Sequence, residues 1–384
     1  MQKMICGELF TGKSVIKDAC IVFDERIIDV GSNIEISERY DCTTLDMGDR
    51  FVMPGFVDSH THGIFAGSRE GELELKLGGK SYMEILNSGL GITKTIKETE
   101  SASDDEILAQ SIERVNNCLS NGTTTMEVKS GYGNNVEGEL RLLRLIGEMK
   151  KMAAGKIDII PTFLSHVEIY EGFSQELLDN MERFRGSARF FDVFMEAFSY
   201  EKSKKMLRKA EEMNFELKLH GDEFSDCGGA ALGAEMDCVS VDHLIKIGDR
   251  GLKAMRDHGT VATLLPATSF SSFEEYANAR KILDYGIPVA LATDLNPNCY
   301  CENMQFVIQL ACYMMHLMPL DALKASTLNG ARALNLNDRG EIAPGKIADF
   351  IVTDCANYME LFSKFGRNHV KMVFKDGKEV VSNT

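Results

Sequence analysis

The sequence predicts an α/β protein whose main body is a (β/α)8 barrel of the TIM type, with a small β-rich domain formed by the N- and C-terminal segments. Eight short apolar runs alternate with longer helical patterns through the middle of the chain, which is typical of parallel strands joined by helices, and eight such strands close a barrel. The 384 residues exceed the roughly 250 of a single barrel. Both chain ends instead carry short alternating runs typical of antiparallel strands.

The predicted barrel strands are continuous apolar runs rather than strict alternations of apolar and polar residues. Parallel strands covered by helices on both faces have this composition because neither face meets water. In chain order they are residues 51–57, 123–128, 157–163, 190–195, 215–219, 237–241, 260–264 and 287–292.

The segments between these strands carry helix signals with readable ends. Ser103 and Glu106 form a capping-box pattern, and the apolar residues that follow recur on one helical face until Gly122. The same periodicity predicts a second helix around residues 140–145 and a third that ends just before Gly286. These helices supply the crossovers that parallel strands need.

The two ends of the chain do not fit the barrel pattern. Residues 1–50 include CIVFDERIIDVG, and residues 345–384 include GKIADFIVTD and VKMVFKDGKEV, in which Asp376-Gly377 is a hairpin-turn signal. We expect these two segments to form a small β-sandwich-like domain and residues 51–344 to form the barrel. A plain extension of the barrel sheet by the same strands is the alternative.

The composition excludes several classes of function. Lys and Arg number 42 against 58 Asp and Glu, a formal net charge of -16, and a field of that sign repels nucleic-acid phosphates. No apolar run reaches the roughly 18 residues of a membrane span, and the start, MQKMICGELF, lacks the apolar stretch of a secretory signal. The ten cysteines show no disulfide-like spacing, which favours a reducing compartment. We therefore expect a cytoplasmic protein that binds neither nucleic acid nor a membrane.

Ionisable residues follow four of the predicted strands at the point where each apolar run stops. His60 and His62 come after the first strand, and their i, i+2 spacing turns both imidazoles to one face. Others end the fifth, sixth and eighth strands: His220, Asp222, Glu223, Asp242, His243 and Asp294. Active sites of such barrels lie at the C-terminal strand ends, where buried polar groups are costly unless paired or bound to a cation. Each residue alone is a plausible surface group, but the ordered set favours a metal site.

The motifs around these residues resemble the metal-dependent amidohydrolase superfamily. PGFVDSHTH, a histidine after the fifth strand and an aspartate after the eighth carry this resemblance. It narrows to the imidazolonepropionase family through HTHGIFAGSREGE, EVKSGYG, IPTFLSH, KLHGDE, VDHL, TVATLLPAT and PVALATDLNP, which run in order from residue 54 to about residue 298. The segment GEIAPGKIADFIV extends the resemblance towards the C-terminus.

The resemblance implies a single zinc or iron ion held by three histidines and one aspartate: His60, His62, His220 and Asp294. Such a set leaves one position open for water, as a catalytic site requires. Glu223 matches the general base that takes a proton from this water and then protonates the leaving nitrogen. His243 matches a histidine that orients the nucleophile or polarises the substrate carbonyl, and Asp294 is counted as catalytic as well as a ligand.

The resemblance also implies a small anionic substrate, contacted by one cationic side chain and several polar ones: Arg69, Tyr132, His166, Glu223 and Asn296. Arg69 matches the position that binds the substrate carboxylate, which a guanidinium can grip with two hydrogen bonds. An ion pair of Arg69 with Glu70 or Glu72 is the alternative for this residue.

Some positions depart from the family pattern or add to it. One residue rather than two separates the leucine of the TFL run from His166, and residues 297–300 read Pro-Asn-Cys-Tyr where the family usually continues with glycine and a small hydroxyl residue. Glu127 and Lys129 are expected to form an internal ion pair rather than to supply a carboxylated bridging lysine. Glu196 is the candidate for a second-metal ligand, which we consider the weaker interpretation.

The implied function is hydrolysis of the cyclic amide bond of 4-imidazolone-5-propanoate to N-formimidoyl-L-glutamate, a step of histidine degradation, by an enzyme expected to be a homodimer. The altered loop 297–300 leaves open a related amidohydrolase or deaminase acting on another cyclic amidine. A catalytically inactive scaffold that keeps the barrel for binding is a third interpretation, and the intact ligand set counts against it.

Overall fold

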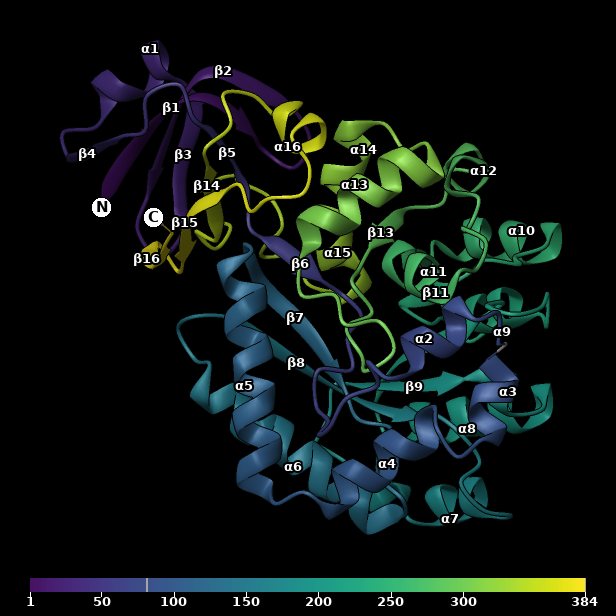
Figure 1. Ribbon diagram of the computed structural model, residues 1–384. Coiled ribbons are helices and arrows are strands. Elements are labelled where there is room, and N and C mark those ends of the chain that lie inside the picture. Colours follow the sequence, from purple (N-terminus) through teal and green to yellow (C-terminus); the bar gives the residue numbers. More distant parts are fainter. Residues whose placement is uncertain (81, 384) are drawn as a thin grey trace.

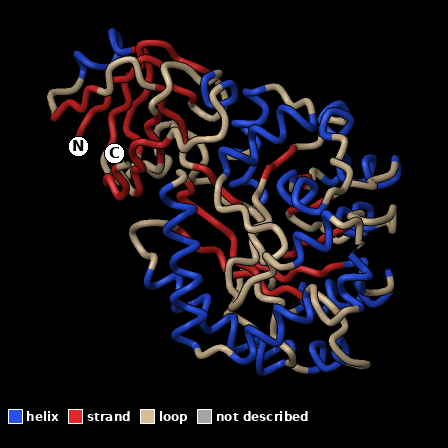
Figure 2. The backbone as a smooth tube through the Cα atoms, in the orientation of Figure 1, coloured by secondary structure: helices blue, strands red, loops and turns tan. Residues whose placement is uncertain are grey.

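The computed structural model describes residues 1–80 and 82–383. The two ends of the chain lie side by side in a sheet set apart from the barrel that the middle of the chain forms (Figure 1). Helices surround the barrel, whereas the terminal sheet consists mainly of strands (Figure 2). The predicted fold class, an α/β barrel with a small β-rich part built from both termini, is confirmed.

The barrel sheet contains, within the described residues, eight parallel strands in sequential order from β6 to β13. Their bounds are β6 (Phe56–Asp58), β7 (Thr123–Lys129), β8 (Asp158–Ser165), β9 (Phe190–Phe194), β10 (Glu216–Gly221), β11 (Ser240–His243), β12 (Val261–Leu264) and β13 (Val289–Leu291). From the second predicted strand onward, each apolar run overlaps one of these strands. Continuous apolar runs therefore identified the barrel.

The first predicted strand, residues 51–57, is divided between two sheets. Phe51–Pro54 forms β5, which pairs with β1 and β14 of the terminal sheet, and only Phe56–Asp58 belongs to the barrel. The chain crosses at Gly55, where an added Cβ would lie 2.4 Å from side-chain atoms of Thr124. The prediction of one barrel strand over 51–57 is wrong, because a continuous apolar run does not reveal which of two sheets it joins.

The terminal sheet has the order β16-β15-β14-β5-β1-β2-β3, and β4 pairs with β1. Its strands are β1 (Gln2–Phe10), β2 (Val15–Phe23), β3 (Ile27–Ser32), β4 (Thr43–Asp46), β5 (Phe51–Pro54), β14 (Phe350–Thr353), β15 (Val370–Lys375) and β16 (Lys378–Ser382). The β15–β16 hairpin turns at Asp376 and Gly377, whose φ angles of 50° and 72° are those of a type I′ turn. The predicted hairpin is confirmed.

Helices cover the barrel and connect its strands. The α-helices are α1 (Asn33–Ile36), α2 (Glu72–Leu77), α3 (Tyr82–Asn87), α4 (Ile92–Ser101), α5 (Asp104–Ser120), α6 (Val136–Met152), α7 (Phe173–Asp179), α8 (Tyr200–Glu212), α9 (Gly229–Glu235), α10 (Asp249–His258), α11 (Pro266–Ser272), α12 (Ala279–Asp284), α13 (Met304–Met315), α14 (Pro319–Ala325), α15 (Leu328–Ala333) and α16 (Glu360–Ser363). Single turns of 3-10 helix are η1 (Ser37–Arg39), η2 (Met181–Phe184) and η3 (Met195–Ala197). Ser103 and Glu106 form the predicted capping box at the start of α5. Among the described helices, none combines the length and the apolar character needed to cross a membrane.

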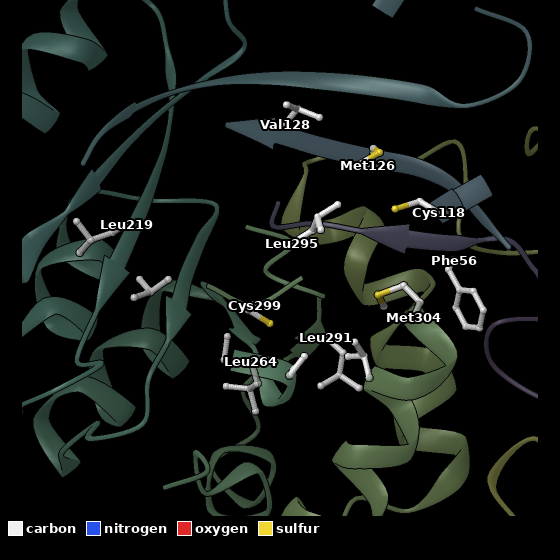
Figure 3. Packing of buried hydrophobic residues seen from close by; sticks show 14 of the residues in the cluster. Phe56, Cys118, Met126, Val128, Leu219, Leu264, Leu291, Leu295, Cys299 and Met304 are labelled. Carbon is white, nitrogen blue, oxygen red and sulfur yellow. The ribbon is translucent and has the colours of Figure 1, made fainter. Parts of the chain in front are cut away.

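The buried core joins the barrel strands to the helices around them (Figure 3). Met126 and Val128 of β7 are fully buried in this apolar layer. Successive side chains of a strand point to opposite faces, so Glu127 and Lys129 of the same strand point into the barrel, where both are also fully buried. The barrel interior below the active-site end is therefore charged rather than apolar.

Candidate active site

The barrel closes at the segments that carry the predicted metal ligands. The chain leaving β6 and the chain leaving β13 are joined by a parallel bridge between Thr61 and Leu295. The Asp294 N–H donates to the His60 carbonyl at 3.0 Å, and the His62 N–H donates to the Leu295 carbonyl at 2.8 Å. These backbone hydrogen bonds fix the positions from which His60, His62 and Asp294 project.

Ligand atoms from the ends of β6, β10 and β13 converge on one point. His60 Nε2 lies 3.3 Å from His62 Nε2, and Asp294 Oδ1 lies 3.5 Å and 3.3 Å from these two nitrogens. Donor atoms that share one ion at bond lengths of about 2.0–2.1 Å lie within about 4.2 Å of one another, and these three atoms meet that condition. His220 joins the group, because one ligand atom from each of the three histidines lies within 4.8 Å of the others.

Two carboxylates orient the histidine rings from behind. His60 Nδ1 lies 2.6 Å from Asp242 Oδ2, and His220 Nδ1 lies 2.9 Å from Asp192 Oδ1. A carboxylate at Nδ1 holds the proton on that nitrogen and leaves the Nε2 lone pair free for a metal ion, as is usual for metal-binding histidines. Burial, reinforced by nearby His60, holds the pKa of His220 well below its usual range, which keeps this ring neutral.

The residues present fit a bound metal ion. Within the described residues, buried His220 Nε2 and Asp294 Oδ1 have no hydrogen-bond partner, and an unpaired buried polar atom costs about 1–3 kcal/mol. The other oxygen of Asp294 accepts a 2.5 Å hydrogen bond from the Thr268 hydroxyl, which directs Oδ1 towards the histidines. A cation among these atoms would satisfy all of them at once.

A buried ionic network supports the two orienting carboxylates. Lys129 Nζ lies 2.6 Å from Asp192, 2.8 Å from Glu127 and 3.7 Å from Asp242. Lys218 Nζ lies 2.8 Å from Glu127 and 3.5 Å from Asp242. Burial alone would lower the Lys129 pKa, but Asp192 and Glu127 outweigh it and raise the pKa above its ordinary value. The predicted ion pair of Glu127 with Lys129 is confirmed as one part of this larger network.

Glu223 and His243 lie beside the ligand cluster at the ends of β10 and β11. Their side chains approach to 3.5 Å, between Glu223 Oε1 and His243 Nδ1. Burial and then the charge of Asp294 raise the pKa of Glu223 well above its ordinary value, and burial lowers the pKa of His243 to about 4. The φ of His243 is 76°, a strained conformation of the kind that clusters at functional sites.

Glu196, in η3, holds the loop that carries Glu223. Its carboxylate accepts hydrogen bonds from the backbone N–H groups of Glu223, Phe224 and Ser225 at 2.8–2.9 Å. Both carboxylate oxygens are used in this way. The observed contacts therefore make Glu196 a loop-positioning residue and give no support to a second-metal role.

A cavity of about 390 Å³ opens onto the ligand cluster. A volume of this order suits a small molecule. All the predicted site residues except His60, which is fully buried behind the others, line this cavity: His62, Arg69, Tyr132, His166, His220, Glu223, His243, Asp294 and Asn296. The His166 ring stacks on the His62 ring with centroids 5.6 Å apart. The structure thus brings every predicted residue to one site, while their individual roles stay predictions.

Arg69 makes the ion pair that the sequence left as an alternative. Its Nε lies 3.0 Å from both Glu72 carboxylate oxygens, and its Nη2 lies 2.8 Å from one of them. Nη2 also lies 3.4 Å from Asn298 Oδ1. The partner is therefore Glu72, and the guanidinium lines the cavity as well.

Several residues of the site were missed or left unassigned in the sequence. Asp192 and Lys218 interrupt apolar strands, and a charge inside a continuous apolar run was the signal that could have identified them. Lys76 and Asn298 also line the cavity. Asn298 lies in the loop 297–300 that departs from the family pattern, whereas Lys76 gave no sequence signal, because a lysine on a short helix is ordinarily a surface residue.

Comparisons with known proteins place the chain in a family. Residues 51–380 match the Amidohydrolase family. The imidazolonepropionase of Pyrobaculum arsenaticum is 41% identical over 379 residues, which cover 95% of this chain and 93% of the relative. The chain belongs to the imidazolonepropionase family of amidohydrolases. The imidazolonepropionase of Porphyromonas gingivalis is 39% identical over 96% of this chain and 89% of its own length.

Solved structures show the same fold at low sequence identity. The 5-methylcytosine deaminase of Klebsiella pneumoniae superposes with a TM-score of 0.78 at 18% identity, covering all of this chain and 98% of the other. E. coli guanine deaminase superposes with a TM-score of 0.76 at 16% identity over both full chains. For this imidazolonepropionase-family chain, these likenesses support the amidohydrolase barrel.

Proposed function

We propose that the protein hydrolyses the cyclic amide bond of 4-imidazolone-5-propanoate to give N-formimidoyl-L-glutamate, a step of histidine degradation. The observation that carries this proposal is the group of His60, His62 and His220, with Asp294 Oδ1 3.5 Å and 3.3 Å from the first two. This group opens onto a cavity also lined by a carboxyl group and by cationic side chains. Relatives that are about 40% identical to this chain are named imidazolonepropionase.

A zinc or iron ion is the proposed cofactor, held by His60, His62, His220 and Asp294. Imidazole and carboxylate donors suit both metals. When bound, such an ion polarises a carbonyl group and lowers the pKa of water at its open position. The carboxylates of Asp192 and Asp242 would keep two of the rings in the tautomer that coordination requires.

Glu223 is the proposed proton carrier of the reaction. It lines the cavity beside Asp294 and His220, so it can take the proton of the attacking water and deliver it to the ring nitrogen as the C–N bond breaks. Its raised pKa suits a group that both accepts and returns a proton near neutral pH. His243, 3.5 Å away, is proposed to orient the water and the ring carbonyl.

The remaining proposed contacts hold the substrate. Tyr132, His166 and Asn296 lie on the cavity wall, where a planar ring can meet aromatic and amide groups. Arg69 is proposed to mark the end of the cavity that receives the propanoate tail. We also propose a homodimer and a cytoplasmic location, the latter supported by ten cysteines that are all free thiols.

The test is turnover of freshly prepared 4-imidazolone-5-propanoate, followed by its ultraviolet absorbance and by appearance of the formimidoyl product. The same preparation is assayed as isolated, after removal of metal, and after zinc or iron is restored, with the metal content measured each time. We expect about one ion per chain and activity that disappears and returns with it. Turnover no faster than in the metal-free control contradicts the proposal, and failure to take up metal favours an inactive scaffold.

A second candidate is hydrolysis of another cyclic amidine. The observation that favours it is Asn298, whose side chain enters the cavity where the family usually has glycine. Assays with 5-methylcytosine and guanine, the neutral rings named in the structural neighbours, separate the two candidates. Faster turnover of a neutral ring than of the imidazolone acid would favour the second.

A further inference from the structure

Lys76 is a cation of the cavity wall that has no anionic partner in the described part of the chain. It lies on α2, is half-buried, and lines the same cavity as the metal-ligand cluster. Its Nζ donates to Asn298 Oδ1 at 2.6 Å and to the Ser271 carbonyl at 3.5 Å. Both acceptors are neutral, so the positive charge of Lys76 is not compensated by a carboxylate within ion-pair distance.

Arg69 differs from Lys76 because its charge is already compensated. Glu72 receives both its Nε and its Nη2, and the same carboxylate accepts the Gly91 N–H at 2.8 Å. Glu72 is only 2% exposed, so this pair is a fixed structural link between α2 and the start of α4. As a unit, Arg69 and Glu72 contribute no net charge to the cavity.

Asn298 fixes the direction of the Lys76 ammonium group. Its Nδ2 donates to the Ser272 hydroxyl at 3.1 Å, and its backbone N–H donates to Asn296 Oδ1 at 2.7 Å. With the amide nitrogen engaged by Ser272, the amide oxygen faces Lys76 and Arg69. An ammonium has three donor hydrogens, so Lys76 keeps donors for a further acceptor.

The surroundings of Lys76 disfavour an unpaired charge. Burial is the largest influence and lowers the Lys76 pKa below its ordinary value, while repulsion from Arg69 is opposed by attraction from Glu72. An anion bound beside Lys76 would offset the effect of burial, because the ammonium would gain a charged partner in a partly desolvated place. The cavity wall at Lys76 thus offers a position for one negative group.

We propose that Lys76, oriented by Asn298, pairs with the carboxylate of the substrate beside Arg69 and is a determinant of specificity for an anionic tail. This proposal rests on the proposed function, which supplies the carboxylate. Arg69, which the sequence matches to the carboxylate position, also fixes Glu72 and α2 through its ion pair.

The test compares Lys76→Met with Lys80→Met and Lys76→Arg in the metal-loaded protein. Lys80 lies on the same cavity edge but is exposed, so its removal takes away an equal charge that solvent screens. We expect Lys76→Met to raise KM at least about tenfold with little change in kcat, Lys76→Arg to restore most of the loss, and Lys80→Met to change KM less than about threefold.

A binding assay separates failure of this proposal from failure of the proposed function. Calorimetry measures 3-(imidazol-4-yl)propanoate and neutral 4-propylimidazole, which share the ring but differ in charge, and it needs no turnover. The proposal is supported if Lys76→Met loses at least about tenfold in affinity for the acid and keeps its affinity for the neutral probe. This holds even if the imidazolone is not hydrolysed. The proposal is overturned if wild type and Lys76→Met bind the acid equally, or if Lys76→Met loses affinity equally for both probes. It is also overturned if wild type does not bind the acid, or if Lys80→Met loses as much affinity for the acid as Lys76→Met.

Discussion

His60 and His220, two of the proposed metal ligands, each have the other ring nitrogen held by a carboxylate. Residues that do not contact a bound ion would therefore also influence its affinity. Asp242 contacts His60 Nδ1 at 2.6 Å and also receives a 2.6 Å hydrogen bond from the Ser240 hydroxyl. It is fully buried, and it lies 3.7 Å from Lys129 Nζ and 3.5 Å from Lys218 Nζ. The side chain is therefore fixed on every side.

Asp242→Asn is expected to weaken metal binding about 10- to 100-fold, because an amide at this position no longer holds the Nδ1 proton of His60 as a carboxylate does. The measurement is the metal retained per chain during competition with a chelator. Ser240→Ala, which removes only the neighbouring hydroxyl, serves as the control and should shift retention much less. Equal metal retention by Asp242→Asn and wild type would show that the Asp242 carboxylate does not affect the affinity of His60 for the metal.

The Arg69–Glu72 ion pair leads to a second prediction for single residues, which concerns the free energy of unfolding. Both side chains are buried, 6% and 2% exposed, and loss of one partner leaves the other charge buried alone. Arg69→Met should lower the free energy of unfolding by about 3 kcal/mol, and Arg69→Met with Glu72→Gln should lower it by less. Chemical denaturation of the four proteins of this cycle measures the coupling, and strictly additive effects would contradict it.

Among the elements, the loop after β10 owes its shape to Glu196. Three backbone N–H groups that donate to one carboxylate hold residues 223–225, so Glu196→Ala should release Glu223 from its place. We expect kcat to fall about tenfold or more while KM changes little, since proton transfer depends on position more steeply than binding does. Glu196→Gln keeps a hydrogen-bond acceptor on one atom, so its kcat should lie between those of wild type and Glu196→Ala. A change in KM alone would argue for a different role.

The crossing between sheets at Gly55 gives a prediction for the strand that joins them. An alanine Cβ would meet Thr124 Cγ2 and Oγ1 at 2.4 Å, and overpacking of this kind costs about 1–3 kcal/mol. Gly55→Ala should therefore lower stability in denaturant, and adding Thr124→Ala should recover part of the loss. Gly147→Ala in α6, where nothing lies within 4 Å of the added atom, is the control and should stabilise by about 0.5–1 kcal/mol. If Gly55→Ala has the same stability as wild type, the backbone at this crossing can shift without cost.

The elements could be predicted because each buried parallel strand is a short apolar run with a helix signal after it. β7 and β12 coincide closely with predicted runs, since burial on both faces favours apolar and β-branched residues. Phe51–Asp58 could not be divided correctly from the sequence, because residues on either side of Gly55 are equally apolar while their partners, β14 and β7, lie far away in the chain. Such pairing is a tertiary property.

In the candidate site, the sequence revealed the histidines and the aspartate because they stand at strand ends in a recognisable order. It did not reveal that Lys76 remains unpaired by any described carboxylate while Arg69 is compensated, since both residues lie near Glu72 in the sequence. That distinction depends on which side chain meets which oxygen in three dimensions. The network of Lys129 and Lys218 was likewise hidden, apart from its one local pair.

At the scale of the whole molecule, the terminal sheet is tied to the barrel by a partly buried charge cluster. Lys375 Nζ in β15 lies 3.1 Å from Asp349 and 3.1 Å from Asp158, the first residue of β8. The Asp349 carbonyl accepts the Gly55 N–H at 3.1 Å, so the same residue also fixes the crossing strand. Stability of this junction should depend on the protonation of its acids.

The two acids should act in opposite directions as pH changes. Burial is the largest influence on Asp349 and raises its pKa to about 6 from the ordinary 3.8, despite Lys375. Burial also opposes ionisation of Asp158, but Lys375 and Arg339 outweigh it and lower its pKa. Folded Asp349 therefore keeps a proton between about pH 4 and 6 that the unfolded chain has released, so its contribution to stability falls as pH rises through this window.

Asp349→Asn removes that pH dependence and gives the sharpest test of the junction. A pKa difference of about two units corresponds to about 3 kcal/mol, so wild type should lose up to about 3 kcal/mol relative to Asp349→Asn between pH 4 and pH 6.5 in denaturant titrations. Asp158→Asn is the matched control with the opposite sign, because the stability supplied by Asp158 is present above its unfolded pKa and is lost as pH falls. Parallel stability curves for wild type and Asp349→Asn across this range would show that the buried carboxyl is ionised in the folded protein, held by Lys375 across the junction.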